Sequence, residues 1–130
     1  MIGQKLGEAR GRTTNVRLLP FDGTPPQIEA SFSGEGSFLE QSMSLIGCYW
    51  EGSRGVDVKF GNARMLLTLA NEEQVFFQGN GVSGKPNRYA SFGEFPWTTS
   101  GLSHLLGIAV VLEYDMLENS GFAWRMWEWS

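Results

Sequence analysis

The sequence predicts an all-β protein, a single antiparallel barrel, closed or nearly closed, of about eight strands. Three observations support this fold class. Apolar and polar residues alternate with a period of two, short turn-forming clusters separate the alternating stretches, and glycine recurs at alternate positions within them. No long amphipathic helix is predicted, which excludes a parallel sheet with crossover helices. The length of 130 residues and the 42% apolar content fit one domain over residues 1–130.

The first two strands are expected over residues 6–19 and 27–38, divided by the turn formers of residues 22–26. Residues 27–38 give the clearest alternation in the chain. One face carries Ile28, Ala30, Phe32, Gly34, Gly36 and Phe38, and the other carries only polar and charged residues. Because successive side chains of a strand point to opposite faces, this strand has one buried face and one solvated face.

The middle of the chain is expected to form four more strands, with connections too short for anything but antiparallel neighbours. These strands cover residues 43–51, 56–69, 74–82 and 88–97, and the turns between them cover residues 52–55, 71–73 and 84–87. Each turn contains glycine, proline or asparagine, which adopt the backbone conformations that tight turns need.

The last two strands are expected over residues 104–115 and 122–129, after turns at 99–101 and 118–121. Both faces of residues 104–115 are largely apolar, although a strand in a monomeric barrel needs only one apolar face. The second face therefore needs a cover, which is the N-terminal segment, a long loop or another subunit. We expect a homo-oligomer.

Rows of small residues favour a barrel over the alternative, a two-sheet sandwich. They are Gly7-x-Ala9-x-Gly11, Gly34-x-Gly36, Gly61-x-Ala63 and Gly79-x-Gly81. Glycines repeated within strands mark sharp bends or close backbone approach, which a small closed barrel requires. No helix follows these pairs, so they are not nucleotide-binding loops.

Composition excludes several function classes. The net charge is −4 without a basic cluster, so no nucleic-acid partner is expected. The longest apolar run, residues 105–112, is too short to cross a bilayer, and residues 1–10 lack the apolar core of a signal peptide. The single cysteine, Cys48, cannot form an internal disulfide, which fits a cytoplasmic location.

Several segments resemble a family of short bacterial and archaeal proteins of unknown function. The segments are LLGIAVVLEY (105–114), ENSG (118–121) and WEW (127–129), with GEARGR (7–12), IEASFSGEGSFL (28–39), GCYWE (47–51) and QGNGV (78–82). The resemblance implies a small barrel of the allene oxide cyclase or lipocalin type, that is, a calycin-like fold, and implies no chemistry. Ala63 and Met65 stand where the family pattern has glycines, which implies a less sharply bent strand or a fuller barrel wall.

Two carboxylates are candidate catalytic residues, and the strand register decides between two arrangements. If Glu113 pairs near Met126, Glu128 lies diagonally on the same face, and two carboxylates in one apolar cavity supply an acid and a base. If the register shifts by one residue, Glu113 faces Arg125 and forms an ion pair. The alternative to a catalytic role is a structural one, in which Glu113 forms a salt bridge or faces solvent.

No cofactor or metal site is predicted. His104 is the only histidine and lacks the partner ligands of a zinc site, so we expect a structural role at a strand end. Cys48 lies between Gly47 and Tyr49 without the signature of a nucleophile, and we expect a small buried residue.

Aromatic residues are abundant enough to fill the core or to line a cavity. The candidate ligand-binding residues are Tyr49, Trp50, Phe77, Phe92 and Arg125. The leading hypothesis is a binding module that holds a small apolar or aromatic ligand. A cofactor-free isomerase or cyclase using a buried carboxylate is the alternative, and a purely structural, self-assembling barrel is a third. A closed interior below about 100 Å³ argues against a substrate, because ligand pockets usually measure about 300 Å³ or more.

Overall fold

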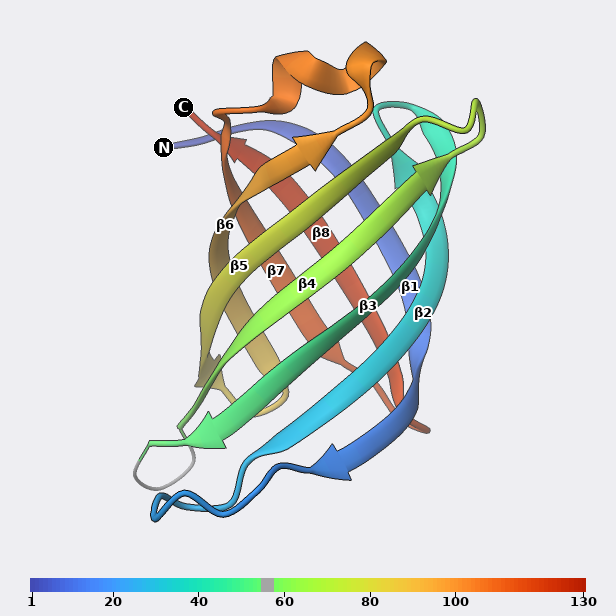
Figure 1. Ribbon diagram of the computed structural model, residues 1–130. Helices are drawn as coiled ribbons and strands as arrows, with labels where there is room; N and C mark the ends of the chain where they lie inside the picture. The colour runs from blue at the N-terminus through green and yellow to red at the C-terminus, as the bar shows by residue number, and fades with distance from the viewer. Residues whose placement is uncertain (55–57) are drawn as a thin grey trace.

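The computed structural model describes residues 1–54 and 58–130 and forms one closed barrel of eight antiparallel strands (Figure 1). The strands are β1 (Ile2–Leu18), β2 (Ile28–Phe38), β3 (Gln41–Ser53), β4 (Lys59–Leu69), β5 (Gln74–Lys85), β6 (Arg88–Thr98), β7 (Ala109–Met116) and β8 (Gly121–Trp129). A 3-10 helix, η1 (Ser100–Leu105), lies between β6 and β7. The predicted barrel is confirmed, and the sandwich alternative is excluded because β1 pairs with both β2 and β8.

The period-two pattern sorts the side chains between the interior and the outer surface as predicted. In β2, Ala30, Phe32 and Phe38 are buried in the core, whereas Ser33 and Glu35 are exposed. The interior positions of all eight strands meet in one hydrophobic cluster, in which phenylalanine, leucine and methionine predominate. Burial of this apolar surface is the main term that stabilises the barrel.

The glycines of the small-residue rows lie close to the backbone of the neighbouring strand. Gly11 of β1 pairs with Gly34 of β2, and a Cβ built on Gly11 would lie 2.1 Å from the carbonyl oxygen of Ser33. A Cβ on Gly36 would lie 2.1 Å from the carbonyl oxygen of Glu8. These backbone contacts leave no space for a side chain, so the glycines permit the strong coiling that closes a small barrel.

The two ends of the barrel differ. At the end that carries both termini and η1, here called the capped end, the helix covers the opening (Figure 1). Leu102 and Leu105 of η1 are 6% and 1% exposed and join the core. The opposite end, where β3 ends and β4 begins, is called the tyrosine end, because Tyr49, Tyr89 and Tyr114 lie there.

The segment before β7 corrects the sequence-based expectation. Residues 104–108 were expected to continue a strand, but η1 extends to Leu105 and β7 begins only at Ala109. Gly107 has a φ of +87°, in the left-handed region that interrupts a strand and favours glycine. His104 therefore lies in the last turn of η1 and not at a strand end.

The other strand boundaries differ less from expectation. β1 begins four residues earlier than the predicted residue 6, at Ile2, and β5 extends past residue 82 to Lys85. β3 continues through Gly52 and Ser53, which were expected in a turn. The predicted strand over residues 56–69 starts at Lys59 as β4, and its first two residues lie outside the described ones.

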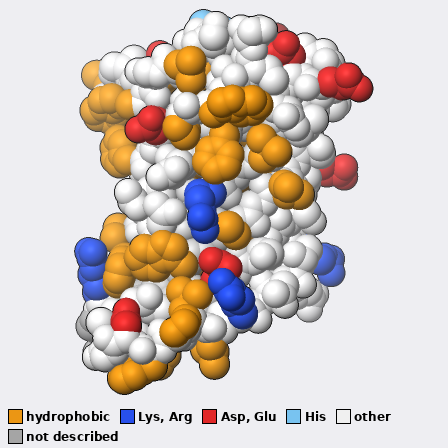
Figure 2. Space-filling view, viewed as in Figure 1, with side chains coloured by type: hydrophobic (Ala, Val, Ile, Leu, Met, Phe, Trp, Pro, Cys, Tyr) orange, Lys and Arg blue, Asp and Glu red, His pale blue; other side chains and the backbone are white. Residues whose placement is uncertain are grey.

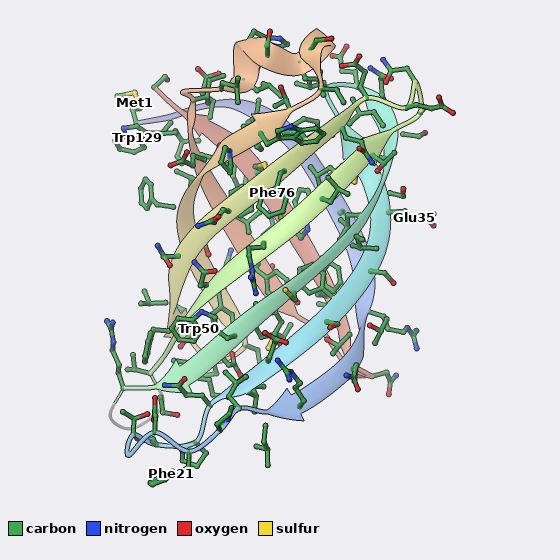
Figure 3. The ribbon with its side chains drawn as sticks, in the orientation of Figure 1. Met1, Phe21, Glu35, Trp50, Phe76 and Trp129 are labelled. Atoms are coloured by element: carbon green, nitrogen blue, oxygen red, sulfur yellow. The ribbon has the colours of Figure 1, made fainter. Side chains whose placement is uncertain are left out.

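Apolar side chains also gather on the outer wall. Figure 2 shows them over the strands that face the viewer, and Figure 3 places Phe76 and Trp129 among the side chains that project from the wall. Val111 of β7 points outward yet is only 9% exposed, and its cross-strand neighbours are Phe92 and Trp127. The second apolar face predicted for this strand is thus partly covered by aromatic neighbours of the same chain.

No helix within residues 1–54 and 58–130 is long and apolar enough to cross a membrane.

Candidate functional site

A pocket of about 50 Å³ lies inside the barrel at the tyrosine end and opens to the outside there. Its walls come from β2, β3, β4, β5, β6 and β7. The lining residues are Phe32, Tyr49, Trp50, Glu51, Gly61, Asn62, Ala63, Met65, Gly81, Tyr89, Ser91, Leu112, Tyr114 and Met116. The lining is almost entirely apolar, with a few polar atoms, which is the usual form of a ligand site.

Small residues create the space for the tyrosine rings. Tyr49 of β3 pairs with Ala63 of β4, and Gly61 pairs with Gly81 of β5. A Cβ built on Gly61 would lie 2.2 Å from the carbonyl oxygen of Trp50, so backbone atoms form this part of the wall. Rings from β3, β6 and β7 occupy the volume that these short side chains leave.

All three tyrosines of the chain meet at this pocket. The ring of Tyr114 lies between the other two, with centroid distances of 6.3 Å to Tyr49 and 6.2 Å to Tyr89, both edge to face. Tyr114 also stacks on Phe122 at 5.3 Å, and Phe32 packs against Tyr49 at 6.0 Å. Packing between aromatic rings fixes the orientation of the tyrosines.

Glu51 places a carboxylate inside the pocket. It lies two residues after Tyr49 on β3, and therefore on the same inward face, and its side chain is only 11% exposed. The hydroxyl of Tyr89 donates a hydrogen bond of 3.0 Å to Oε2 of Glu51. The ammonium of Lys59 lies 3.7 Å from Oε1, and the Lys59 side chain is half exposed at the mouth.

Burial keeps the three tyrosine hydroxyls protonated at pH values where exposed phenol groups ionise. Burial, followed by the charge of Glu51, raises the pKa of Tyr49 from 10.0 to about 12. The pKa of Tyr89 and that of Tyr114 are raised further, again chiefly by burial. The buried hydroxyl of Tyr114 has no hydrogen-bond partner within residues 1–54 and 58–130. A buried hydroxyl without a partner is costly, and a ligand can supply the missing partner.

The predicted ligand-binding residues are not brought together. Tyr49 lines the pocket, and Trp50 contributes to its wall, although its ring packs with Phe60 at 5.5 Å on the outer side. Phe77 is fully buried in the core cluster. Phe92 is 58% exposed on the outer wall, where it packs against Trp129 at 5.8 Å.

The strand register selects the ion-pair arrangement for Glu113. Glu113 pairs with Arg125 across β7 and β8, and Arg125 Nη2 lies 3.1 Å from Oε2 of Glu113. The same nitrogen lies 3.1 Å from Oδ2 of Asp115, and these two carboxylates raise the pKa of Arg125. Glu128 pairs with Val110, so it is not diagonal to Glu113 as the two-carboxylate arrangement requires. None of Glu113, Glu128 and Arg125 lines the pocket.

Sequence reasoning missed three of the polar residues of the pocket: Glu51, Tyr89 and Tyr114. A signal was present, because Glu51 continues the inward face of Gly47 and Tyr49, and Tyr114 continues that of Val110 and Leu112. Period two alone indicates that each points inward. Only the closed pairing order shows that β3, β6 and β7 face one another across one end of the barrel.

The remaining candidate groups lie elsewhere. Cys48 is half-buried on the outer wall, where its Sγ accepts a contact of 3.2 Å from Nη2 of Arg64. Within the part of the chain that the structure describes, no cluster of three or more histidine, cysteine, aspartate or glutamate side chains is arranged to hold a metal ion.

Comparison with protein-family models and with curated protein sequences finds no match. Solved structures do match along nearly the whole chain. A protein of unknown function from Clostridium acetobutylicum has a TM-score of 0.81 at 13% identity, covering 98% of this chain and 95% of its own. A conserved protein of unknown function from Rhodopseudomonas palustris has a TM-score of 0.78 at 12% identity, covering 96% and 95%. A β-barrel-like protein from Acinetobacter baumannii has a TM-score of 0.76 at 15% identity, covering 96% and 94%. At these identities the likeness is one of fold, and the chain is similar to β-barrels whose function is unknown.

Proposed function

We propose that this protein is a binding module that takes a small, mainly apolar ligand, or the end of a longer one, into the pocket at the tyrosine end. The single observation that carries the proposal is an under-satisfied polar group inside an apolar pocket: the buried Tyr114 hydroxyl, which lacks a partner among the described residues. On folding, this hydroxyl loses its hydrogen bonds to water and gains none from the described residues. A ligand that hydrogen-bonds to the hydroxyl offsets this loss of free energy.

The free volume limits what enters. About 50 Å³ admits water molecules or a short aliphatic group without movement of the walls, and a whole aromatic compound needs the tyrosine rings to move. The expected ligand therefore inserts one narrow end and leaves the rest outside the barrel.

The alternative, a cofactor-free isomerase or cyclase, has one specific feature in its favour: the carboxylate of Glu51 inside the pocket. We favour binding for two reasons. Glu51 is already bonded to Tyr89 and near Lys59, and the pocket is too small to enclose a substrate.

A filling variant tests the binding function with n-butanol as a neutral probe. Ala63 lines the pocket, so Ala63→Leu reduces its volume, whereas Ala90→Leu makes the same change at an exposed position beside Tyr89. We expect saturable n-butanol binding in NMR titrations of the wild type and of Ala90→Leu, and binding at least about tenfold weaker in Ala63→Leu. Equal binding by both variants, or none by the wild type, would contradict the proposal.

Three further properties belong to this proposal. The closed eight-strand barrel with a pocket at one mouth supports a calycin-like relationship of the allene oxide cyclase or lipocalin type. The single cysteine supports a cytoplasmic location.

The third property is self-association, which the exposed aromatic residues of the outer wall, Phe92, Trp97 and Trp129, support. Light scattering at micromolar concentration should give the mass of an oligomer, and a monomeric mass would end this part of the proposal.

A further inference from the structure

The pocket contains one full charge, and that charge is negative. Among the lining residues Glu51 is the one carboxylate, and no lysine, arginine or histidine is among them. A phenol is neutral at pH 7, and burial raises the pKa of each tyrosine further, so these rings add no second negative charge. An anionic ligand would meet the negative charge of this carboxylate in an apolar surrounding, which is strongly unfavourable.

The carboxylate of Glu51 is only partly compensated by the protein. Oε2 accepts the hydroxyl of Tyr89, but a neutral donor leaves the charge in place. Lys59 provides the nearest described positive charge, and its Nζ lies 3.7 Å from Oε1, beyond hydrogen-bond distance. Half of the Lys59 side chain is in solvent, so this ion pair is weak and easily exchanged.

The rings beside Glu51 favour a cation for an independent reason. The face of an aromatic ring carries partial negative charge and attracts a cation placed within about 6 Å of its centre. Tyr49, Tyr89 and Tyr114 contact one another across this end of the interior, and Glu51 is bonded to one of them. A carboxylate beside several aromatic rings is suited to an ammonium group.

We infer that the ligand is a primary amine with a short aliphatic chain, bound as its ammonium ion by Glu51. This inference rests on the proposed binding function and names the chemical class of the ligand. The ammonium takes the place of the Lys59 Nζ at Oε1, and the hydroxyl of Tyr114 is a second acceptor. The aliphatic chain packs on the apolar lining formed by Phe32, Leu112 and Met116.

Three probes of equal length separate charge from size: n-butylammonium, n-butanol and butyrate. NMR titration of the full chain at pH 7 should give the tightest binding for n-butylammonium, about tenfold or more tighter than for n-butanol, because the hydrogen bond to the carboxylate is charge-assisted. Butyrate should bind most weakly. Variants of Glu51, Glu113 and Lys59 then test where the ammonium binds.

Glu51→Gln keeps an acceptor for Tyr89 but removes the charge, so the preference for the amine over the alcohol should disappear while n-butanol still binds. Glu113→Gln removes a carboxylate from the outer wall and should leave the preference unchanged. Lys59→Gln removes the internal competitor and should tighten n-butylammonium binding severalfold. The backbone N–H of Lys59 still bonds Oγ of Ser83 in that variant, which keeps β4 in place.

The outcomes separate this inference from the function on which it rests. If n-butanol binds the pocket as tightly as n-butylammonium, or if Glu51→Gln keeps the preference, the amine class is wrong while the binding function survives. Weaker amine binding by Lys59→Gln would also contradict the placement of the ammonium. If none of the three probes binds, both the binding function and the amine class are overturned.

Discussion

The two ends of the barrel are built on the same eight strands but filled in opposite ways. At the capped end, Phe38, Phe77 and Phe95 are fully buried, and their rings pack edge to face at 5.9 and 6.2 Å. Leu102 and Leu105 of η1 cover this end. At the tyrosine end, the interior holds hydroxyl groups, a carboxylate and about 50 Å³ of free volume.

The difference indicates where stability and function reside. The capped end gains from apolar burial, and η1 covers it. The tyrosine end keeps polar groups inside a low-dielectric space, which costs stability and is typical of a binding site.

Truncation at the capped end should have the largest effect on stability. Phe38 is completely buried and packs against Phe95, so Phe38→Ala should lower the free energy of unfolding by about 3–5 kcal/mol. Urea denaturation followed by tryptophan fluorescence measures this loss. A loss below about 1 kcal/mol would show that the capped end is not the main core.

Alkaline pH should act on the tyrosine end through its phenol groups, because all three tyrosines lie there. The folded chain retains phenolic protons that the unfolded chain loses near pH 10, so the stabilisation is complete below pH 10. It falls as the pH rises from 10 toward 12, where Tyr49 ionises in the folded state. Tyrosinate absorbance near 295 nm should therefore appear late and together with unfolding.

Tyr114→Phe should remove about a third of that absorbance change and make the loss of stability with pH less steep. Tyrosinate formation near pH 10 in the folded protein would contradict the buried placement of the three rings.

Removing single hydroxyl groups should separate two tyrosines of the same pocket. Tyr89→Phe deletes the hydrogen bond to Glu51 and should cost about 1–2 kcal/mol, less than for a fully buried charged pair because the site is partly exposed. Tyr114→Phe deletes a hydroxyl without a described partner and should change stability by less than about 0.5 kcal/mol, or raise it. Equal losses would show that Tyr114 has a partner in the folded protein.

The smallest effect is expected on the outer wall. The ion pairs of Glu113 with Arg125 and Arg88 are partly exposed, so Glu113→Gln should cost less than about 1 kcal/mol. The cost should shrink as salt is added, because screening weakens exposed ion pairs. A loss of several kcal/mol, unaffected by salt, would place Glu113 in a more critical role than its position suggests.

Most of the fold was predictable because it depends on local alternation and on glycine spacing. The inward face of β2 and the close approach of Gly34 and Gly36 both follow from the sequence pattern. The segment 104–108 was not predictable, because a short apolar run is compatible both with a buried strand and with a short helix that covers a barrel end. The left-handed φ of Gly107 decides between the two, and composition does not specify it.

Less of the candidate site was predictable. Tyr49 was identified because aromatic residues are expected to line cavities, but the same argument selected Phe92, which points outward. Tyr89 and Tyr114 line the same pocket as Glu51 because β6 and β7 face β3 across the interior. Periodicity shows which way a side chain points, but it does not show which strands, far apart in the sequence, face each other. The choice between ion pair and cavity for Glu113 required the register of β7 and β8.

The most direct test of the account is a map of where a bound probe perturbs the protein. Backbone amide chemical shifts should be recorded during titration with n-butylammonium at pH 7. The largest shifts should cluster at Tyr49, Glu51, Tyr89 and Tyr114, while the shifts of Phe38, Leu102 and Leu105 at the capped end should stay unchanged. Shifts that cluster at the capped end, or on the outer wall around Phe92 and Trp129, would contradict it.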